Sequence, residues 1–183
     1  MAEYNPAGVT VMPNIISEEQ LLGMNNLGAG NLINTDYGKL FENKDIQEGI
    51  VAMLKTNDFV CEKLELVVTE PGDDFRKWQI ACDPAGDKKQ MIVVLAVSDV
   101  EESCGSILWI PFIQKLKQVP TVTQLQKSNF KDETTFKVYQ MKKRFAVMKA
   151  GDVALVNPYM WYSLGYNTTK NTTRILVATF GAK

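Results

Sequence analysis

Beyond residue 57 the chain is a succession of short β-type segments separated by turn residues, and this pattern constrains the fold more than any other feature. Residues 61–69 (CEKLELVVT) alternate polar and apolar side chains, and residues 91–97 (MIVVLAV) form the continuous apolar run expected of a central strand. Further strands are expected at 77–82, 106–111, 135–141, 146–148, 153–157 and 174–180. About eight short strands with frequent turns are typical of a β-sandwich or a double-sheet jelly roll.

The N-terminal part has a different pattern, in which a short strand is followed by helices. Val9 and Val11 alternate with other residues and predict the strand. Ser17 is a good N-cap, and Gln20 stands at the reciprocal position of a capping box. A first helix is therefore expected to begin at Ser17 and to end at 28–31 (GAGN).

A second helix is expected over 44–54, where apolar side chains recur at helical spacing. Together these elements predict one domain over 1–183. Its helical N-terminal part, 1–57, packs on one face of a β core, 58–183. The expected architecture is mainly β with flanking helices.

The composition excludes several functional classes. The chain has 183 residues, of which 45% are hydrophobic, and this is enough for a sizeable core. Its 20 basic residues are balanced by 21 acidic ones, so the chain has no excess positive charge with which to bind nucleic acid. Apolar runs stay far below the roughly 20 residues that span a bilayer, so no membrane span is expected.

The N-terminus and the cysteines indicate an intracellular setting. Residues 1–14 lack the basic and apolar regions of a signal peptide, so we expect a protein of the cytoplasm or of a particle assembled inside the cell. Cys61, Cys82 and Cys104 are odd in number and lack CxxC spacing, which indicates reduced thiols and not a disulfide framework. No base stands beside Cys82 or Cys104, so both are interpreted as inert small residues.

The chain contains no histidine. Catalysis by imidazole, as in Ser-His-Asp or Cys-His arrangements, is therefore excluded, and so are metal sites built on histidine. A metal held by carboxylates and water alone is still compatible with the composition.

Three blocks of the sequence carry a family resemblance. They are GVTVMPNIISEEQL at 8–21, LAVSDVEESCGSILWIP at 95–111 and GDVALVNP at 151–158, the last followed by Trp161, Tyr162, Gly165, Asn167 and Arg174. In this order, and over nearly the whole chain, they resemble the phytanoyl-CoA dioxygenase family. Its members are iron(II)- and 2-oxoglutarate-dependent oxygenases, so the resemblance implies a double-stranded β-helix.

The resemblance also locates the family's metal ligands, which are a His-x-Asp motif after a tryptophan and a distal histidine. Here Trp78 is followed by Gln79 and Ala81 at the first two ligand positions, and Tyr162 follows Trp161 at the distal position. An amide oxygen is a poor iron ligand, a methyl group is none, and tyrosine ionises only near pH 10. The resemblance therefore implies that all three ligands are lost, with no metal, no cofactor and no catalytic residue.

Two other features leave a binding role open. Arg174 matches the arginine that pairs with the far carboxylate of 2-oxoglutarate in the family, and is a candidate anion-binding residue; the alternative is a solvated or ion-paired arginine. Aromatic residues are expected near the mouth of the family's pocket, where they either line a ligand or partner site or fill the former cofactor space: Trp78, Trp109, Trp161, Tyr159, Tyr162 and Tyr166.

We therefore expect a catalytically inactive pseudo-oxygenase, not an enzyme, that acts as a structural or protein-interaction subunit, in an oligomer or a larger particle. The net charge of −1 leaves little repulsion between copies, so self-association or a protein partner is expected. Candidate contact residues are the aromatics Tyr4, Tyr37, Phe41, Phe130 and Phe136. The alternative is a module that binds a small carboxylate in the emptied cofactor pocket.

Overall fold

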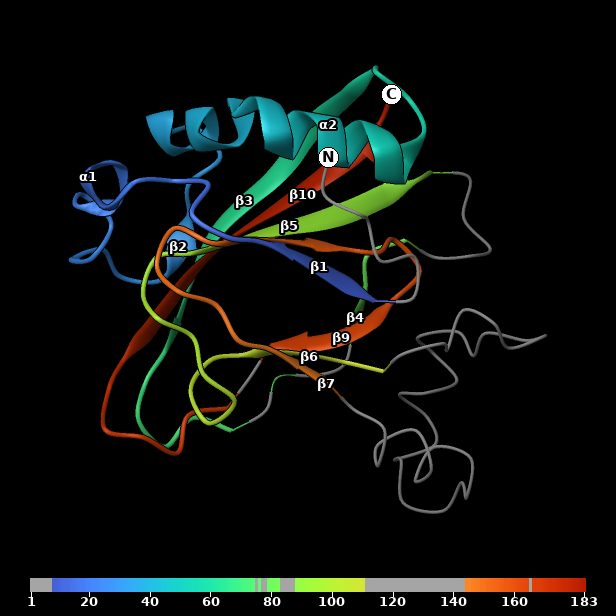
Figure 1. The fold of residues 1–183 in the computed structure, drawn as a ribbon. Helices are drawn as coiled ribbons and strands as arrows, with labels where there is room; N and C mark the ends of the chain where they lie inside the picture. Colours follow the sequence, from blue (N-terminus) through green and yellow to red (C-terminus); the bar gives the residue numbers. More distant parts are fainter. Residues whose placement is uncertain (1–7, 75, 77–78, 83–87, 111–143, 165) are drawn as a thin grey trace, which may run out of the picture.

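The computed structural model describes residues 8–74, 76, 79–82, 88–110, 144–164 and 166–183. Two antiparallel β-sheets lie face to face, and the helices cover the outer face of the larger sheet (Figure 1). The fold is mainly β with flanking helices, a double-stranded β-helix of the jelly-roll type, which confirms the expected fold class. In chain order the elements are β1 (Val9–Met12), α1 (Glu18–Leu21), β2 (Gly30–Asn31), the 3-10 helix η1 (Asp36–Glu42), α2 (Lys44–Leu54), β3 (Phe59–Thr69), β4 (Gln79–Ile80), β5 (Gln90–Ala96), β6 (Ile107–Trp109), β7 (Arg144–Ala146), β8 (Val153–Val156), β9 (Trp161–Leu164) and β10 (Thr173–Ala182).

The order of the strands brings distant parts of the chain together. The larger sheet has the order β1-β8-β5-β10-β3-β2, and the smaller sheet has the order β4-β9-β6-β7. The N-terminal strand β1 pairs with β8, with Val9 opposite Val156, so the segment before the helices is part of the β core. Strands β3 and β10 pair from Thr173 opposite Thr69 to Ala182 opposite Phe59 and form the longest pairing in the larger sheet.

Side-chain alternation along the larger sheet creates two apolar cores. On β10, Ile175 and Val177 belong to the core between the two sheets, which we call the inter-sheet core. Leu176 and Ala178 point the other way, into a second core beneath the helices, the helix-side core. The side of the sheet that a residue faces is therefore fixed by its parity along the strand.

The second helix was predicted correctly and the first only in part. Helix α2 spans Lys44–Leu54 and buries Ile46, Ile50 and Leu54, four residues apart, in the helix-side core. Ser17 and Gln20 form the expected capping box, but α1 ends after one turn. Gly23 follows shortly after, and glycine is a poor helix former.

Most predicted strands are present. Strand β7 ends at Ala146, the residue at which the strand 146–148 was expected to begin, and β4 ends at Ile80, before the predicted end at 82. The strand expected at 135–141 lies outside the described residues. Strand β9 was not predicted. All four of its residues are buried, so its sequence WYSL shows no apolar–polar alternation.

One of the aromatic residues predicted to contact a partner, Phe41, is buried. Phe41 is 2% exposed, and its ring meets the Phe180 ring edge-on with centroids 5.9 Å apart in the helix-side core. The 3-10 helix η1 turns Phe41 toward the sheet, so it is not a surface residue. Tyr37 is half-buried, and its hydroxyl donates to the Gly23 carbonyl at 3.3 Å. The other three, Tyr4, Phe130 and Phe136, lie outside the described residues.

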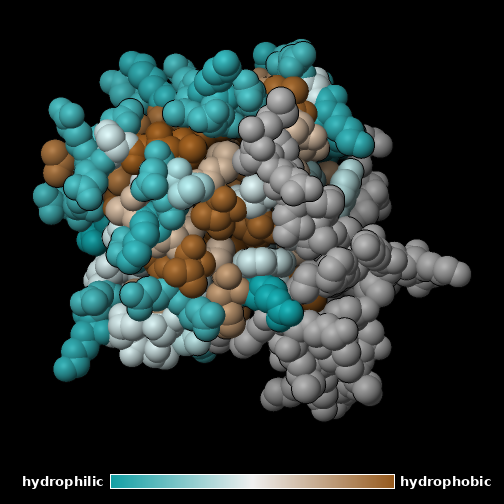
Figure 2. All heavy atoms as spheres, viewed as in Figure 1, coloured by the Kyte–Doolittle hydropathy of each residue, from teal (hydrophilic) through white to brown (hydrophobic). Residues whose placement is uncertain are grey.

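Polar side chains cover much of the face drawn in Figure 2, and apolar side chains emerge among them as smaller patches. Among the described residues, the large apolar side chains that are most exposed are Leu22 (66%), Val147 (53%) and Val60 (44%). None of the helices in the described part has the length and apolar character needed to cross a membrane.

Candidate functional site

A row of three side chains crosses the smaller sheet on its inner face. Tyr162 on β9 is the register partner of both Trp109 on β6 and Gln79 on β4. Leu164 lies two residues after Tyr162 and belongs to the inter-sheet core, as does Ile107 two residues before Trp109. Since residues two apart share a face, the row Trp109–Tyr162–Gln79 faces the larger sheet.

The larger sheet faces this row with an ion pair. Glu65 on β3 is the register partner of Val177, which lies in the inter-sheet core, so Glu65 and Lys63 point to the same side. The Lys63 Nζ lies 2.8 Å from the Glu65 Oε1, and the two side chains are 57% and 39% exposed. This end of the space between the sheets is therefore open to solvent and carries two charges that neutralise each other.

Tyr162 is the buried member of the row, with 4% of its surface exposed. Burial raises the pKa of its hydroxyl far above the usual value, and the negative charge of Glu65 raises it further. The phenol is therefore neutral and can donate a hydrogen bond. Among the described buried side chains, the polar atom that lacks a hydrogen-bond partner is the Trp161 Nε1, one residue before Tyr162. Gln79, by contrast, is exposed, and Trp109 is half-buried.

The structure brings together two of the three positions implied as former metal ligands. Gln79 and Tyr162 are directly opposite each other, and Ala81 follows β4, half-buried against the inter-sheet core. The donors here are an amide, a neutral phenol and, across the space, a carboxylate already paired with Lys63. These residues do not fit an iron(II) site of two imidazoles and one carboxylate. Nor do the described residues contain a group of three or more Cys, Asp or Glu side chains that could hold a metal ion.

Arg174 lies on the other side of the larger sheet. It shares its face with Leu176, which belongs to the helix-side core, and its Nε donates to the Leu27 carbonyl at 3.3 Å. Its backbone N–H donates to the Ser98 hydroxyl at 2.8 Å. The candidate anion-binding residue therefore does not line the space between the sheets, because its position on β10 has the opposite parity to Ile175.

Three of the expected aromatic residues lie in or against the inter-sheet core. Trp161 and Tyr162 belong to it, with 2% and 4% of their surfaces exposed, and the half-buried Trp109 packs against it. Trp78 lies outside the described residues. Tyr159 and Tyr166 lie outside β4, β6 and β9, so neither belongs to the row.

Lys63 and Glu65 were missed by sequence reasoning. They alternate with Leu64 and Leu66, which is the pattern of a strand whose polar face is in water. The two leucines instead face the helix-side core, and the polar face looks toward the smaller sheet. No local signal in the sequence indicates that second sheet.

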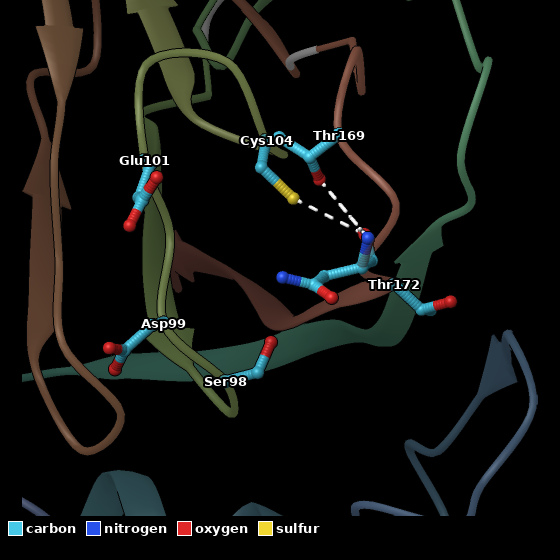
Figure 3. A pocket seen from close by; sticks show the side chains of 7 residues that line it. Ser98, Asp99, Glu101, Cys104, Thr169 and Thr172 are labelled. Carbon is cyan, nitrogen blue, oxygen red and sulfur yellow. Dashed lines mark hydrogen bonds between the residues drawn. The ribbon is translucent and has the colours of Figure 1, made fainter.

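A separate pocket of about 190 Å³ lies between two loops (Figure 3), lined by Ser98, Asp99, Glu101, Cys104, Thr169, Asn171 and Thr172. Cys104 is 6% exposed. Its Sγ lies 2.7 Å from the Thr173 Oγ1 and donates a hydrogen bond to the Asn171 carbonyl at 3.4 Å. Asp99 accepts from Lys149 Nζ at 2.7 Å and from the Ala150 N–H at 3.0 Å. Cys104 and Asp99 therefore already have partners, and those of Asp99 lie outside the lining of the pocket. All three cysteines are free thiols.

Solved structures of similar fold include an iron-bound protein and two non-heme alpha ketoglutarate dependent enzymes. HygX from Streptomyces hygroscopicus with iron bound is similar over 97% of this chain and 83% of its own, with 10% identity and a TM-score of 0.78. The non-heme alpha ketoglutarate dependent epimerase SnoN and carbocyclase SnoK from nogalamycin biosynthesis are similar over 97% of this chain and over 77% and 80% of theirs, with 13% and 12% identity and TM-scores of 0.71 and 0.74. No protein-family model and no curated protein matches the sequence.

The chain therefore has the fold of the iron(II)/2-oxoglutarate oxygenases. At this level of identity the likeness defines the fold alone.

Proposed function

We propose that this protein is a non-catalytic member of the oxygenase fold, a scaffold that acts by binding and not by oxidation. The observation that carries the proposal is the pair formed by Gln79 and Tyr162 in register, at positions where the resemblance implies metal ligands. The chain has no histidine with which to replace either of them. Glu65, the carboxylate that faces the pair, is bound to Lys63.

The proposed role of the scaffold is association with itself or with another protein. The net charge of −1 gives little repulsion between copies. Leu22 and Val147, both more than half exposed, are the apolar side chains most available to a partner in the described part. Phe41 is in the core and is no longer a candidate, so they join the other predicted aromatic residues as candidates for contact.

A carboxylate-binding role has less support. Arg174 faces the helix side of the larger sheet, and the positive charge of Lys63 is neutralised by Glu65. An anion between the sheets would lose its hydration without meeting an unpaired cation among these side chains. These side chains suit a neutral ligand better than an anion.

The proposal is tested by rebuilding the metal site. The triple variant Gln79→His, Ala81→Asp, Tyr162→His restores the two imidazoles and the carboxylate, and Ni(II) can stand in for iron in a calorimetric titration. We expect about one equivalent of tight binding in the triple variant and none in the wild type. Stoichiometric iron(II) in the wild type, with succinate formed from 2-oxoglutarate, would overturn the proposal. Failure of the folded triple variant to bind would show that the ligand positions are misassigned.

Association is measured by sedimentation of the wild type at micromolar concentration, alone and with extract of the source cells. The result expected is a species larger than the monomer in at least one run. A monomer in both runs would contradict the subunit role while leaving the absence of turnover unaffected.

A further inference from the structure

We propose that two adjoining pockets, which meet at Ser98, form a docking surface for a different protein, and that they bind a segment of it that combines apolar side chains with lysine or arginine. The inference rests on the proposed function, because it takes the chain to act by association. It deepens that function by assigning the surface and the chemistry of the partner.

The two pockets share one residue of their linings. The larger pocket, of about 310 Å³, has an apolar lining of Leu21, Leu22, Val97 and Ala150, with Glu18 beside them. The smaller is the pocket of about 190 Å³ described above, which Asp99 and Glu101 line from one loop (Figure 3). Ser98 lines both pockets, and its hydroxyl accepts from the Arg174 N–H at 2.8 Å. The junction of the two pockets is therefore bound to β10.

The two most exposed of the large apolar side chains described lie in or beside these linings. Leu22 lines the larger pocket and is 66% exposed. Val147 is 53% exposed and precedes Met148, which forms an antiparallel bridge with Val100. Val100 and Met148 lie in the inter-sheet core, so their neighbours Glu101 and Val147 point outward, next to each other. A partner that covered both pockets would remove this apolar surface from water.

The charges of the linings are acidic. Glu18, Asp99 and Glu101 line the two pockets, whereas no lysine or arginine does so among the described residues. Asp99 is paired with Lys149 at 2.7 Å. Glu18 and Glu101 form no ion pair with another described residue. Two carboxylates thus stay free to meet the lysine or arginine side chains of a partner.

The same carboxylates argue against a second copy as the occupant. A symmetric dimer brings the same patch of both copies together, so Glu18 and Glu101 would lie against other carboxylates. Lys149 is already engaged, since Asp99 and, more weakly, Glu101 raise the pKa of its ammonium. The other nearby cations are the exposed Lys170 and Arg174, whose Nε donates to the Leu27 carbonyl. A basic, partly apolar segment of another protein avoids the contact between like charges.

The experiment is a peptide titration of the full chain at low salt, followed by the backbone amide signals in NMR. The probes are a short synthetic peptide of leucine and lysine, the same peptide with serine in place of leucine, and the same peptide with glutamate in place of lysine. We expect saturable binding of the leucine–lysine peptide, with shifts at Leu22, Ser98 and Glu101. The serine and glutamate peptides should each bind at least tenfold more weakly.

Variants at exposed positions separate the apolar contribution from the charged one. Leu22→Ser should weaken binding of the leucine–lysine peptide about tenfold or more. Glu101→Gln should weaken it about two- to fivefold at low salt, and this difference should vanish at high salt. The matched controls are Val60→Ser and Asp58→Asn, which should bind as the wild type does. Val60 pairs with Gly181, seven residues along β10 from Arg174, so it lies roughly 23 Å from the junction at Ser98.

Three peptide results would overturn the inference: no saturable binding of the leucine–lysine peptide, equal binding of the glutamate peptide, or binding that Leu22→Ser and Glu101→Gln both leave unchanged. A wild-type dimer that Leu22→Ser dissociates would make a second copy the occupant, and would overturn it as well.

The sedimentation runs separate this inference from the proposed function. If extract gives a larger species with the wild type and with both variants alike, association stands and only the surface is wrongly assigned. If neither run gives a larger species and the leucine–lysine peptide does not bind, the role in association fails with it.

Discussion

Gly151 is the position at which a single added carbon should disturb this fold most. It opens the turn into β8 with φ of +90°, a conformation that L side chains rarely adopt. A Cβ placed there would lie 2.2 Å from the backbone oxygen of Ile16. The Gly151 carbonyl also accepts from the N–H groups of Ile15 and Ile16, at 3.1 and 3.0 Å, so the turn is bound to the segment after β1 and cannot move away alone.

The expected destabilisation has two parts. Holding a residue with a side chain in a left-handed conformation costs about 1–3 kcal/mol. The clash adds to this, because the atom in the way belongs to the backbone and its movement would break the two hydrogen bonds, each worth roughly 1 kcal/mol. We therefore expect Gly151→Ala to lose about 3–5 kcal/mol, and Gly151→Val to lose more.

The assay is urea denaturation followed by circular dichroism. With a slope of about 2 kcal/mol per molar urea, such a loss lowers the midpoint by roughly 1.5–2.5 M. The control is Gly28→Ala, since an added Cβ at Gly28 meets nothing within 4 Å. Gly28→Ala should leave the midpoint unchanged or raise it slightly. Equal midpoints for Gly151→Ala and the wild type would refute the reasoning.

Two further predictions concern the core and a surface ion pair. Phe41→Ala should cost about 3–5 kcal/mol, because the ring is 2% exposed and packs on Phe180; a loss below about 1 kcal/mol in the same assay would contradict its burial. The pKa of Asp99 is lowered by hydrogen bonds from Lys149 and from the Ala150 N–H, so Asp99 stabilises the fold above its ordinary pKa, and this stabilisation is lost as the pH falls through the lowered value. A carboxyl titration by NMR should give a pKa below 3.8 for Asp99 in the wild type and a higher one in Lys149→Met; an unchanged pKa would contradict the role of the ammonium.

The sequence by itself determined the local elements whose causes are local. The capping box of Ser17 and Gln20 and the helix over Lys44–Leu54 depend on neighbouring residues, and both were predicted. The strand at 91–97 was equally clear, because a continuous apolar run is buried on both faces wherever it lies. The lack of histidine excludes imidazole chemistry whatever fold the chain adopts.

The register between strands could not be predicted in the same way. The pairing of Gln79 with Tyr162 depends on β4 and β9, which are separated by most of the β core. Strand β9 itself was missed, since all four of its residues are buried and its sequence shows no apolar–polar alternation. The resemblance located the two positions, but the fold makes them neighbours.

The tertiary structure alone decided which layer the polar side chains on each face of the larger sheet meet. A strand has two faces, and its residue pattern defines the parity of the side chains but not the identity of the layer that each face meets. Arg174, expected in the pocket, faces the helices, whereas Lys63 and Glu65, whose pattern suggests a face in water, look toward the smaller sheet. The candidate site depends on this packing of the two sheets. A side chain can contribute to a site only where the second layer encloses the face of the sheet that carries it.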